Sequence, residues 1–511
     1  MNYSQESLDR LQKLEKIKNL GINPYPGKYE KLHSLADLHQ AYEQKSELRS
    51  TDEVKKNPLP SYKTAGRLVA MRSHGKLSFA KLKDDTAEIQ ICFIEELFTD
   101  AEVELLKLLD VADFIGVTGE LFLTNHGELT LMVKEFVLLA KTIRPLPEKW
   151  HGIKDQETKY RKRYLDLASD ADTFRRFQLR ANFMRAMRDF YHQNGFIELQ
   201  TPILVNKASG ALATPFVTHH ESLDLDVYLR IATETYLKKA VAGGFERVYE
   251  LGPVFRNEGI DPSHLQEFYM CEHYAAYWDY EDNMRFTEAM IRYILDQLFG
   301  TQIVTIRDRD GNPHQVDFGK EWPRVTMAEL IKKDANIDLS EVNTAEGLRA
   351  AIKAQGIKLD VPNYEQLGYG NLLDVLYKKV SRPKLVEPVF LIKHPVDLSP
   401  LARRSDSEPE LTDRFQLVVS SWEVVNAYSE LVDPVDQKAR LEDQARLKSQ
   451  GDTEAMMMDE PFIEAMEHGM PPMSGWGMGI ERIIALLTEQ DNLRDVVLFP
   501  LLRPETSSDI D

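Results

Sequence analysis

The sequence predicts an α+β protein of two or three domains, in which a small β-barrel precedes a larger region of mixed strands and helices. Three observations support this prediction. The chain has 511 residues, more than a single hydrophobic core usually organises. Residues 62–139 show the pattern of short β-strands, and residues 248–274 read as strand, loop and strand between longer helical patterns.

Composition limits the classes of function. The formal net charge of -19 argues against a uniformly basic nucleic-acid binder, so any RNA contact must come from a local patch. The two cysteines, Cys92 and Cys271, lack partners at metal-binding spacing, which fits a reducing compartment and no zinc site of the usual type. The sequence shows no signal-peptide core and no apolar run near the ~18 residues of a membrane span. We therefore expect a cytoplasmic protein without a membrane segment.

Residues 1–60 are predicted to form an N-terminal helical extension. Ser7 to Leu20 has an apolar stripe at helical spacing, and we expect Ser7 to cap this helix. A shorter helix is expected over Ser34 to Lys45, followed by a linker at Asn57 to Pro60.

Residues 61–143 are predicted to form a five-stranded OB-fold barrel. A helical pattern, Glu95 to Leu109, falls between the third and fourth of five strand candidates, an order that is typical of this fold. The candidates are Thr64–Arg72, Leu77–Lys83, Ile89–Ile94, Ile115–Leu123 and Leu129–Leu139.

The first two strands of the barrel carry basic residues and no acidic residue between Tyr62 and Lys83, with Phe79 among them. Cations that meet phosphates and a ring that stacks on a base suit single-stranded nucleic acid. The alternative is that Phe79 belongs to the core and the lysines form a solvated edge. The basic residues are Lys63, Arg67, Arg72, Lys76, Lys81 and Lys83.

Residues 144–170 are expected to be a linker, with a basic junction at 159–164, and residues 171–504 a second large domain, with a tail at 505–511. Residues from about 300 to 385 look like an insertion in this domain. Helices are predicted over Thr173–Gln193, Glu281–Leu298 and Pro434–Gln450, and strands over Val389–Lys393 and Phe415–Ser420.

The stretch from Val248 to Tyr274 is the centre of this domain. Residues two apart on a strand share a face, so Phe268, Glu272 and Tyr274 line up on the second strand and Arg256 ends one face of the first. If the two faces coincide, Arg256 suits a phosphate, Phe268 a purine ring and Glu272 a cation. An exposed hairpin with solvated charges is the alternative.

Two later motifs carry further candidates. In WEVVNAYSEL, from Trp422 to Leu431, a regular strand would place Glu423 and Asn426 on opposite faces. In GWGMGIERIIALL, alternating glycines precede a helix whose first turn holds Arg482, where a second phosphate could bind. Close packing between helix and strand explains these glycines equally well.

Together these segments resemble the class II aminoacyl-tRNA synthetases, and within them the bacterial lysyl-tRNA synthetases, from about Tyr62 to Pro504. The resemblance implies an antiparallel sheet flanked by helices, an OB-fold that binds the anticodon, and a homodimer interface near the helix that ends at Gly195. It rests on RKRYLDL (161–167), PFVTHHESLDLDVYLRIATE (215–234), FRNEG (255–259), SPLARR (399–404), YSEL (428–431), HGMPP (468–472) and GMGIER (477–482).

The resemblance implies a lysine–tRNA ligase that uses ATP and Mg²⁺, forms lysyl-adenylate from L-lysine and transfers lysine to tRNA(Lys). Arg256 and Arg482 are then the catalytic residues, and Glu423 is a magnesium ligand beside Gln416. The remaining implied sites are ATP at Arg256, Glu258, His264, Phe268, Glu423 and Arg482; lysine at Gly210, Ala211, Glu234, Arg256, Glu272, Tyr274, Asn426 and Glu430; and the anticodon at Arg72, Phe79 and Gln90.

The chain departs from the family pattern at several positions. Gln416 stands where the family has a second magnesium carboxylate, which weakens the expected metal site because hard cations favour charged oxygens. The other departures are Leu265-Gln266-Glu267 for Asn-Pro-Glu, Ser209 for a glycine, Thr214 for an arginine, and Val425 and Ala427 for glycines.

Three other hypotheses stay open: an aspartate or asparagine ligase, a non-catalytic tRNA-binding protein, and an enzyme that lysylates protein, whose relatives lack the barrel.

Overall fold

The computed structural model describes residues 3–43, 60–147, 153–308, 310–359, 361, 364–449 and 456–504. The expected tail at 505–511, most of the linker at 57–60 and the last residues of two predicted helices, 44–45 and 450, lie outside them. The chain divides into two compact units, residues 1–170 and 171–511. No helix within the described segments is long and apolar enough to cross a membrane.

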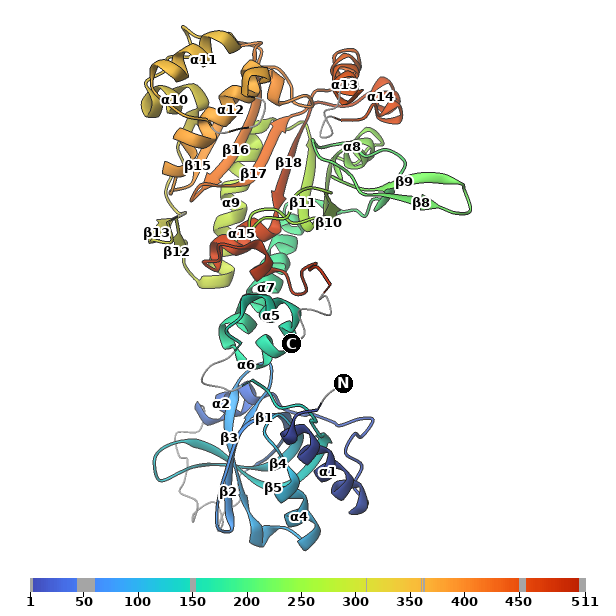
Figure 1. Ribbon diagram of the computed structural model, residues 1–511, viewed down its shortest axis with the longest axis vertical. Helices are drawn as coiled ribbons and strands as arrows, with labels where there is room; N and C mark the ends of the chain where they lie inside the picture. The colour runs from blue at the N-terminus through green and yellow to red at the C-terminus, as the bar shows by residue number, and fades with distance from the viewer. Residues whose placement is uncertain are drawn as a thin grey trace. The chain divides into compact units, whose positions relative to one another are not determined.

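The first unit contains the predicted OB-fold barrel, which is confirmed (Figure 1). Its five strands close in the order β1-β2-β3-β5-β4, and all pairs are antiparallel except β3 with β5. The strands are β1 (Ser61–His74), β2 (Leu77–Lys83), β3 (Glu88–Ile94), β4 (Phe114–Leu123) and β5 (Leu129–Ala140).

The helix predicted between β3 and β4 is divided in two, a 3-10 turn at Glu95–Leu97 and α4 at Asp100–Leu108. The division occurs because Thr99 starts α4 with a reciprocal capping box to Glu102. The first helix, α1 (Gln5–Asn19), begins earlier than expected: Ser4 is its cap, and Ser7, the predicted cap, lies buried inside it. Ile17 of α1 and two leucines of α2 (Leu35–Glu43) join the barrel core. Two short helices, α5 (Gln156–Arg161) and α6 (Arg163–Ser169), complete this unit.

The second unit is built on an eight-stranded sheet in the order β14-β15-β16-β17-β18-β11-β10-β6 (Figure 1). Its neighbours are antiparallel except for the edge pairs β14–β15 and β10–β6. The strands are β6 (Ile197–Glu198), β10 (Arg247–Phe255), β11 (Glu267–Ala276), β14 (Arg324–Thr326), β15 (Val389–Pro395), β16 (Leu411–Val419), β17 (Trp422–Ser429) and β18 (Met473–Gly479).

One face of this sheet is covered by α7 (Ala171–Gln193), α9 (Tyr280–Phe299) and α15 (Ile480–Leu487). The odd-numbered residues Tyr249 and Leu251 of β10 and Cys271 of β11 lie in the hydrophobic core with these helices. Because side chains alternate along a strand, the even-numbered residues face the other side. The face opposite the helices is therefore left for a site.

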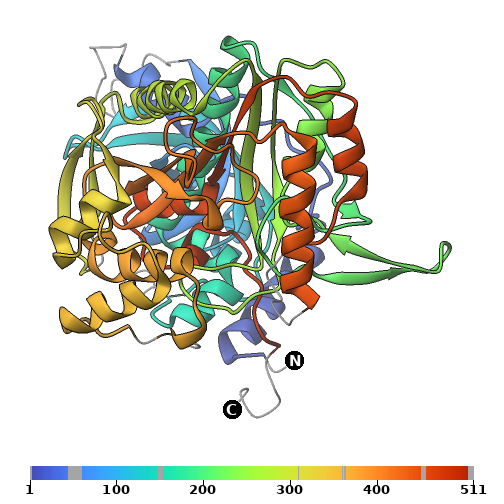
Figure 2. The same cartoon turned by 90° about the horizontal axis from the view of Figure 1, so that it is seen from above.

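The remaining elements surround the sheet. The insertion contributes a small helical core, which also includes Leu391 of β15 and Val418 of β16, and Figures 1 and 2 show α10–α12 on the opposite side of the unit from the β8–β9 hairpin. The elements are β7 (Leu204–Val205), β8 (Val217–His220), β9 (Leu225–Leu229), α8 (Glu234–Ala242), β12 (Ile303–Arg307), β13 (Pro313–Asp317), α10 (Met327–Ala335), α11 (Ala345–Ala354), α12 (Tyr369–Val380), α13 (Pro434–Ser449), α14 (Glu460–Glu467) and 3-10 turns at Tyr364–Gln366, Arg382–Lys384, Val396–Leu398 and Leu493–Val496.

Candidate active site

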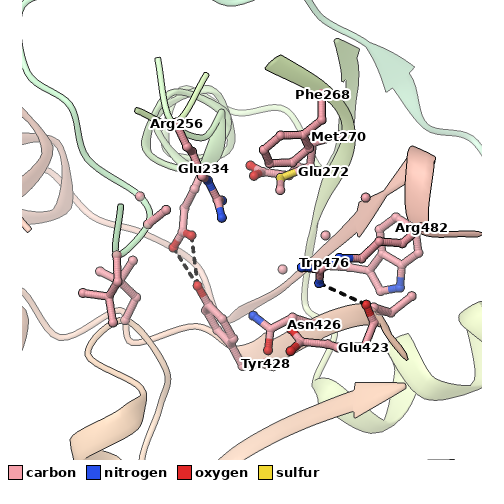
Figure 3. Close-up of a pocket in the computed structure, with 18 of the residues that line it drawn as sticks. Glu234, Arg256, Phe268, Met270, Glu272, Glu423, Asn426, Tyr428, Trp476 and Arg482 are labelled. Carbon is pink, nitrogen blue, oxygen red and sulfur yellow. Dashed lines mark hydrogen bonds between the residues drawn. The ribbon is translucent and has the colours of Figure 1, made fainter. Parts of the chain in front are cut away.

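A cavity opens on the uncovered face of the sheet, and β11 together with the loop that follows β10 forms one of its walls (Figure 3). Val254 pairs with Phe268, and Glu250 pairs with Glu272. Directly opposed residues of antiparallel strands point to the same side, so the two faces coincide. Phe268, Met270, Glu272 and Tyr274 line the cavity.

Arg256 directly follows β10 and lines the same cavity. Its Cζ atom lies 5.2 Å from the centroid of the Phe268 ring, and its Nε donates to the carbonyl oxygen of Ile231 at 3.4 Å. Glu258 and His264, from the loop between the strands, also line the cavity; His264 is exposed and its Nδ1 lies 2.8 Å from Asp261 Oδ2. The loop after β10 and the start of β11 thus place a cation, a ring and two polar side chains around one opening.

Strand β17 does not have the regular alternation that we expected. Its pairing with β16 shifts between Leu417 and Val418, because Val424 is inserted as an extra residue opposite them. Such a bulge reverses the alternation, so Glu423 and Asn426, which a regular strand would separate, both line the cavity (Figure 3). The expectation that they face opposite ways was wrong.

The glycines of β18 keep the middle of the cavity open. Gly475 pairs with Tyr274 and Tyr428, and Gly477 pairs with Glu272 and Asn426. A Cβ atom on Gly475 would lie 2.1 Å from Glu430 Oε1 and 2.4 Å from the Tyr274 ring. No side chain fits there without displacing both neighbours.

Arg482 lies in the first turn of α15 and lines the cavity, as expected. Its Nη1 donates to the backbone carbonyl oxygen of Glu423 at 3.2 Å (Figure 3). This contact leaves the carboxylate of Glu423 to other partners. Arg482 and Glu423 therefore bring a cation and an anion to the same region of the cavity.

The other region of the cavity is acidic. Glu234 begins α8, and both of its carboxylate oxygens accept from the Tyr428 hydroxyl, at 2.9 and 3.0 Å. Glu272 accepts from the hydroxyl and the backbone N–H of Thr233, at 2.7 and 3.2 Å. Figure 3 shows Arg256 reaching between Glu234 and Glu272.

Glu430, the third predicted carboxylate, is not among the residues that line the cavity but adjoins two that do. It follows β17, is 2 % exposed, and its Oε1 lies against Gly475 and Tyr274, which do line the cavity. Neither carboxylate oxygen has a hydrogen-bond partner among the described residues, and only Oε2 is neutralised, by an ion pair with Lys238. A buried carboxylate oxygen without a partner is costly, which indicates a cationic ligand.

Burial dominates the electrostatics of this acidic region. Burial and the charge of Glu234 raise the pKa of Glu272 to about 7, although Thr233 and Arg256 oppose the shift. Burial also raises the pKa of Glu430 well above its usual value, and the neighbouring Lys238 offsets part of the effect. The pKa values of the Tyr274 and Tyr428 hydroxyls are raised by the same cause, so both hydroxyls stay protonated.

The loop at residues 209–211 closes over Glu234. Gly210 has a φ of +89°, and a Cβ atom there would lie 2.9 Å from Glu234 Cβ, so both the conformation and the space require glycine. Gly210 and Ala211 line the cavity. Ser209, which stands where the family has glycine, donates to Asp459 Oδ2 at 2.6 Å and thereby ties the loop to α14.

The residues expected to bind magnesium were brought only partly together. Glu423 lines the cavity, but Gln416 does not, although its backbone pairs with Asn426. The described residues contain no cluster of three or more His, Cys, Asp or Glu side chains that could hold a metal ion. Magnesium usually binds through one or two carboxylates together with substrate phosphates. Glu423 therefore fits an ion that binds together with ATP.

Three residues of the site were missed from the sequence. Tyr428 and Arg414 line the cavity, and Arg414 Nε donates to Asn426 Oδ1 at 2.8 Å. Lys238 contacts Glu234 from one helical turn away. Two signals were available, since Tyr428 lies two residues from Asn426 in a strand-like segment, and Lys238 lies four residues from Glu234, the spacing of neighbours on a helix.

The three candidate anticodon residues gather on the outer side of the barrel. Arg72 pairs directly with Phe79, and Gln90 lies on the next strand, opposite Lys81. Phe79 is not part of the barrel core; it is partly exposed and packs on a separate cluster with Cys92. Arg72 is exposed, whereas Gln90 is buried and donates to Thr130 Oγ1 at 2.9 Å. Phe79 therefore lies outside the main barrel core but packs against this smaller buried cluster, so the core alternative is only partly excluded.

Both structural units match families of known proteins. Residues 155–503 match the family of tRNA synthetases class II (D, K and N), and residues 62–139 match the OB-fold nucleic acid binding domain. The chain is 42% identical over 502 residues to the lysine–tRNA ligase of Fervidobacterium nodosum, which covers 98% of this chain and 95% of the relative. It is 40% identical over 500 residues to the lysine–tRNA ligase of Staphylococcus aureus, and that match covers 98% of this chain and 99% of the relative. It is 46% identical over 446 residues to the lysine–tRNA ligase of Aquifex aeolicus, and that match covers 86% of this chain and 73% of the relative. The chain therefore belongs to the class II tRNA synthetases of the D, K and N group.

Proposed function

We propose that the chain is an ATP-dependent lysine–tRNA ligase. The observation that carries the proposal is the acidic region of the cavity, where Glu234, Glu272 and the unpaired Oε1 of Glu430 lie close together. Free lysine brings two ammonium groups, and buried ammonium groups need carboxylate partners. The similarity to lysine–tRNA ligases over nearly the whole chain supports the same assignment.

In the first step, a carboxylate oxygen of lysine attacks the α-phosphorus of ATP. A new O–P bond forms while the bond from the α-phosphorus to the bridging oxygen breaks, and pyrophosphate leaves. Arg256 holds the α-phosphate and the lysine carboxylate, and Arg482 holds the terminal phosphates. No protein nucleophile is needed, because catalysis comes from positioning and from neutralising charge.

The remaining contacts orient the two substrates. Phe268 stacks on adenine, and Glu258 and His264 contact the nucleotide. Glu234 and the Gly210–Ala211 backbone receive the α-amino group, and Asn426 assists at the carboxylate. Glu430 and Tyr274 receive the side-chain ammonium, with Glu272 close by.

Glu423 would hold Mg²⁺ together with the ATP phosphates. The bound ion would neutralise phosphate charge. Because Gln416 lies outside the cavity wall, Glu423 is the one protein carboxylate that we assign to the ion.

In the second step, a hydroxyl of the 3′-terminal ribose of tRNA(Lys) attacks the carbonyl carbon of lysyl-adenylate. The hydroxyl loses its proton, the bond to AMP breaks, and lysine becomes esterified to the tRNA. Arg72 and Phe79, on the outer side of the barrel, would read the anticodon by charge and stacking. Gln90 would join them only if its bond to Thr130 opened.

We further propose a cytoplasmic homodimer. The β8–β9 hairpin exposes Val217 and Leu223, which are 58% and 63% exposed, and apolar residues that project from a unit in this way favour association with a second chain. The two cysteines are free and buried, which fits a reducing compartment.

ATP–pyrophosphate exchange without tRNA tests the proposal, with each amino acid supplied separately. We expect exchange with lysine alone. Exchange with aspartate or asparagine would move the assignment to a sister ligase. Absence of exchange with every amino acid would favour a non-catalytic tRNA-binding protein.

A further inference from the structure

Lys238 is an ammonium group buried between two carboxylates of the acidic region. It lies on α8, one turn after Glu234, and its side chain is 1% exposed. Its Nζ lies 2.5 Å from Glu234 Oε1 and also forms an ion pair with Glu430. Lys238 therefore joins two carboxylates that come from distant parts of the chain.

Aromatic rings enclose the rest of this ammonium. Nζ lies 5.7 Å from the ring centroid of Tyr274, 5.8 Å from that of Tyr428 and 5.6 Å from that of Phe462. The groups that face Lys238 thus come from α8 itself, from β11, from β17 and the residue after it, and from α14. Among them the titratable groups are Glu234, Glu430 and the two tyrosine hydroxyls, with Glu272 farther along β11.

Stability does not explain this arrangement well. A buried ion pair often contributes no more to folding than well-packed apolar residues of the same volume. Without Lys238, however, Glu234 and Glu430 would face each other with no cation between them. Both carboxylates contact the same Nζ atom, so they lie close together. Two buried carboxylates that lie close together resist joint ionisation, so one of them would take up a proton.

We propose that Lys238 is a positioning residue for recognition of the diamino acid: its ammonium holds the carboxylates of Glu234 and Glu430 in place and favours their charged forms. Glu234 then remains available for one ammonium group of the substrate, and Oε1 of Glu430 for the other. Lys238 lies outside the cavity wall, so it acts through these carboxylates and does not touch the substrate. The inference rests on the proposed function, which it extends by a residue that fixes specificity for two positive charges.

The test compares Michaelis constants in ATP–pyrophosphate exchange with lysine. In Lys238→Met, which keeps the length and removes the charge, the KM for lysine should rise about 30-fold or more at pH 7, the scale expected when a buried charge loses its partner. The KM for ATP should stay within about twofold of wild type, because none of the groups that contact Lys238 is assigned to ATP. Lys238→Arg, which keeps the charge, should recover most of the lost affinity.

A pH profile separates this role from a merely structural one. In Lys238→Met the two carboxylates lose their partner and ionise less readily, so raising the pH should narrow the gap between the KM values for lysine of the variant and the wild type. Comparing the two enzymes at each pH removes the titration of free lysine, which affects both KM values alike. Lys239→Met is the matched control, because it removes the neighbouring lysine of the same helix. The Nζ atom of Lys239 lies 3.8 Å from Asp459 Oδ1. The KM of Lys239→Met for lysine should stay near the wild-type value.

The outcomes separate the inference from the proposed function. If the wild type does not exchange with lysine, the proposed function fails. If the wild type exchanges with lysine but Lys238→Met keeps the wild-type KM for lysine, only the role of Lys238 is overturned. The same holds if Lys238→Met loses affinity for lysine and for ATP equally. Should Lys238→Met not fold, Lys238→Gln, which keeps N–H donors without charge, is judged by the same criteria.

Discussion

Glu430 Oε1 lies so close to Gly475 that a Cβ atom on this glycine would stand 2.1 Å from it. Gly475 pairs with Tyr274 and Tyr428, which line the cavity, so the side chain it lacks leaves the space that the Glu430 carboxylate occupies. Gly475→Ala should displace Glu430 and Tyr274 and strongly reduce lysine activation while ATP still binds. Exchange kinetics with lysine and ATP varied in turn measure both effects.

Gly477→Ala is the comparison for that prediction. Its added Cβ would come no closer than 3.6 Å to a side chain, that of Glu272. The loss should therefore be much smaller than in Gly475→Ala. Equal losses in the two variants would show that the approach of Gly475 to Glu430 has no special importance.

The raised pKa of Glu272 predicts a pH dependence for lysine use. With a pKa of about 7, Glu272 is ionised above that pH and neutral below it. A neutral carboxyl attracts an ammonium group less, so kcat/KM for lysine should fall as the pH drops through about 7 and should level off above it. Glu272→Gln should lower kcat/KM and remove this transition. An unchanged transition in the variant would assign it to another group.

The magnesium requirement tests the role of Glu423. Hard cations favour charged oxygens, so Glu423→Gln should raise the Mg²⁺ concentration for half-maximal exchange by about tenfold or more. Gln416 lies outside the cavity wall, so Gln416→Glu should change the requirement less. A magnesium titration of the exchange rate measures both. The assignment fails if Gln416→Glu has the larger effect.

The barrel should affect tRNA and not amino-acid activation. Phe79→Ala removes a partly exposed ring, and loss of one stacked base should lower kcat/KM for tRNA(Lys) by about 10- to 100-fold. Exchange without tRNA should stay at the wild-type rate. Leu77→Ala is the control, because Leu77 packs on the same small cluster as Phe79. If Leu77→Ala impairs charging equally, Phe79 acts through packing.

The sequence predicted those parts of the site that depend on local periodicity. The alternation in β10 and β11 was enough to place Phe268 and Glu272 on one face, since no bulge interrupts their pairing. The same reasoning failed for Glu423 and Asn426, because the bulge at Val424 depends on the register with β16, which no local pattern reveals.

Partners distant in the chain were also hidden from the sequence. Glu250 and Glu272 are equivalent by alternation, yet Glu250 forms a buried ion pair with Arg230 and only Glu272 lines the cavity. Gln90 looked available to a ligand but is buried against Thr130 of β5. Local pattern predicts which face a side chain takes, whereas tertiary packing decides whether its charge or amide is already satisfied.

The most direct test of the account is the discrimination between lysine and norleucine, which has the same chain without the ammonium group. Wild-type enzyme should prefer lysine strongly in ATP–pyrophosphate exchange. Glu430→Gln should raise the KM for lysine by about 100-fold or more, the cost of losing one partner of a buried charge pair, and should hardly change the KM for norleucine. If Glu430→Gln keeps the wild-type preference for lysine, the buried carboxylate does not read the side-chain ammonium, and the central claim is contradicted.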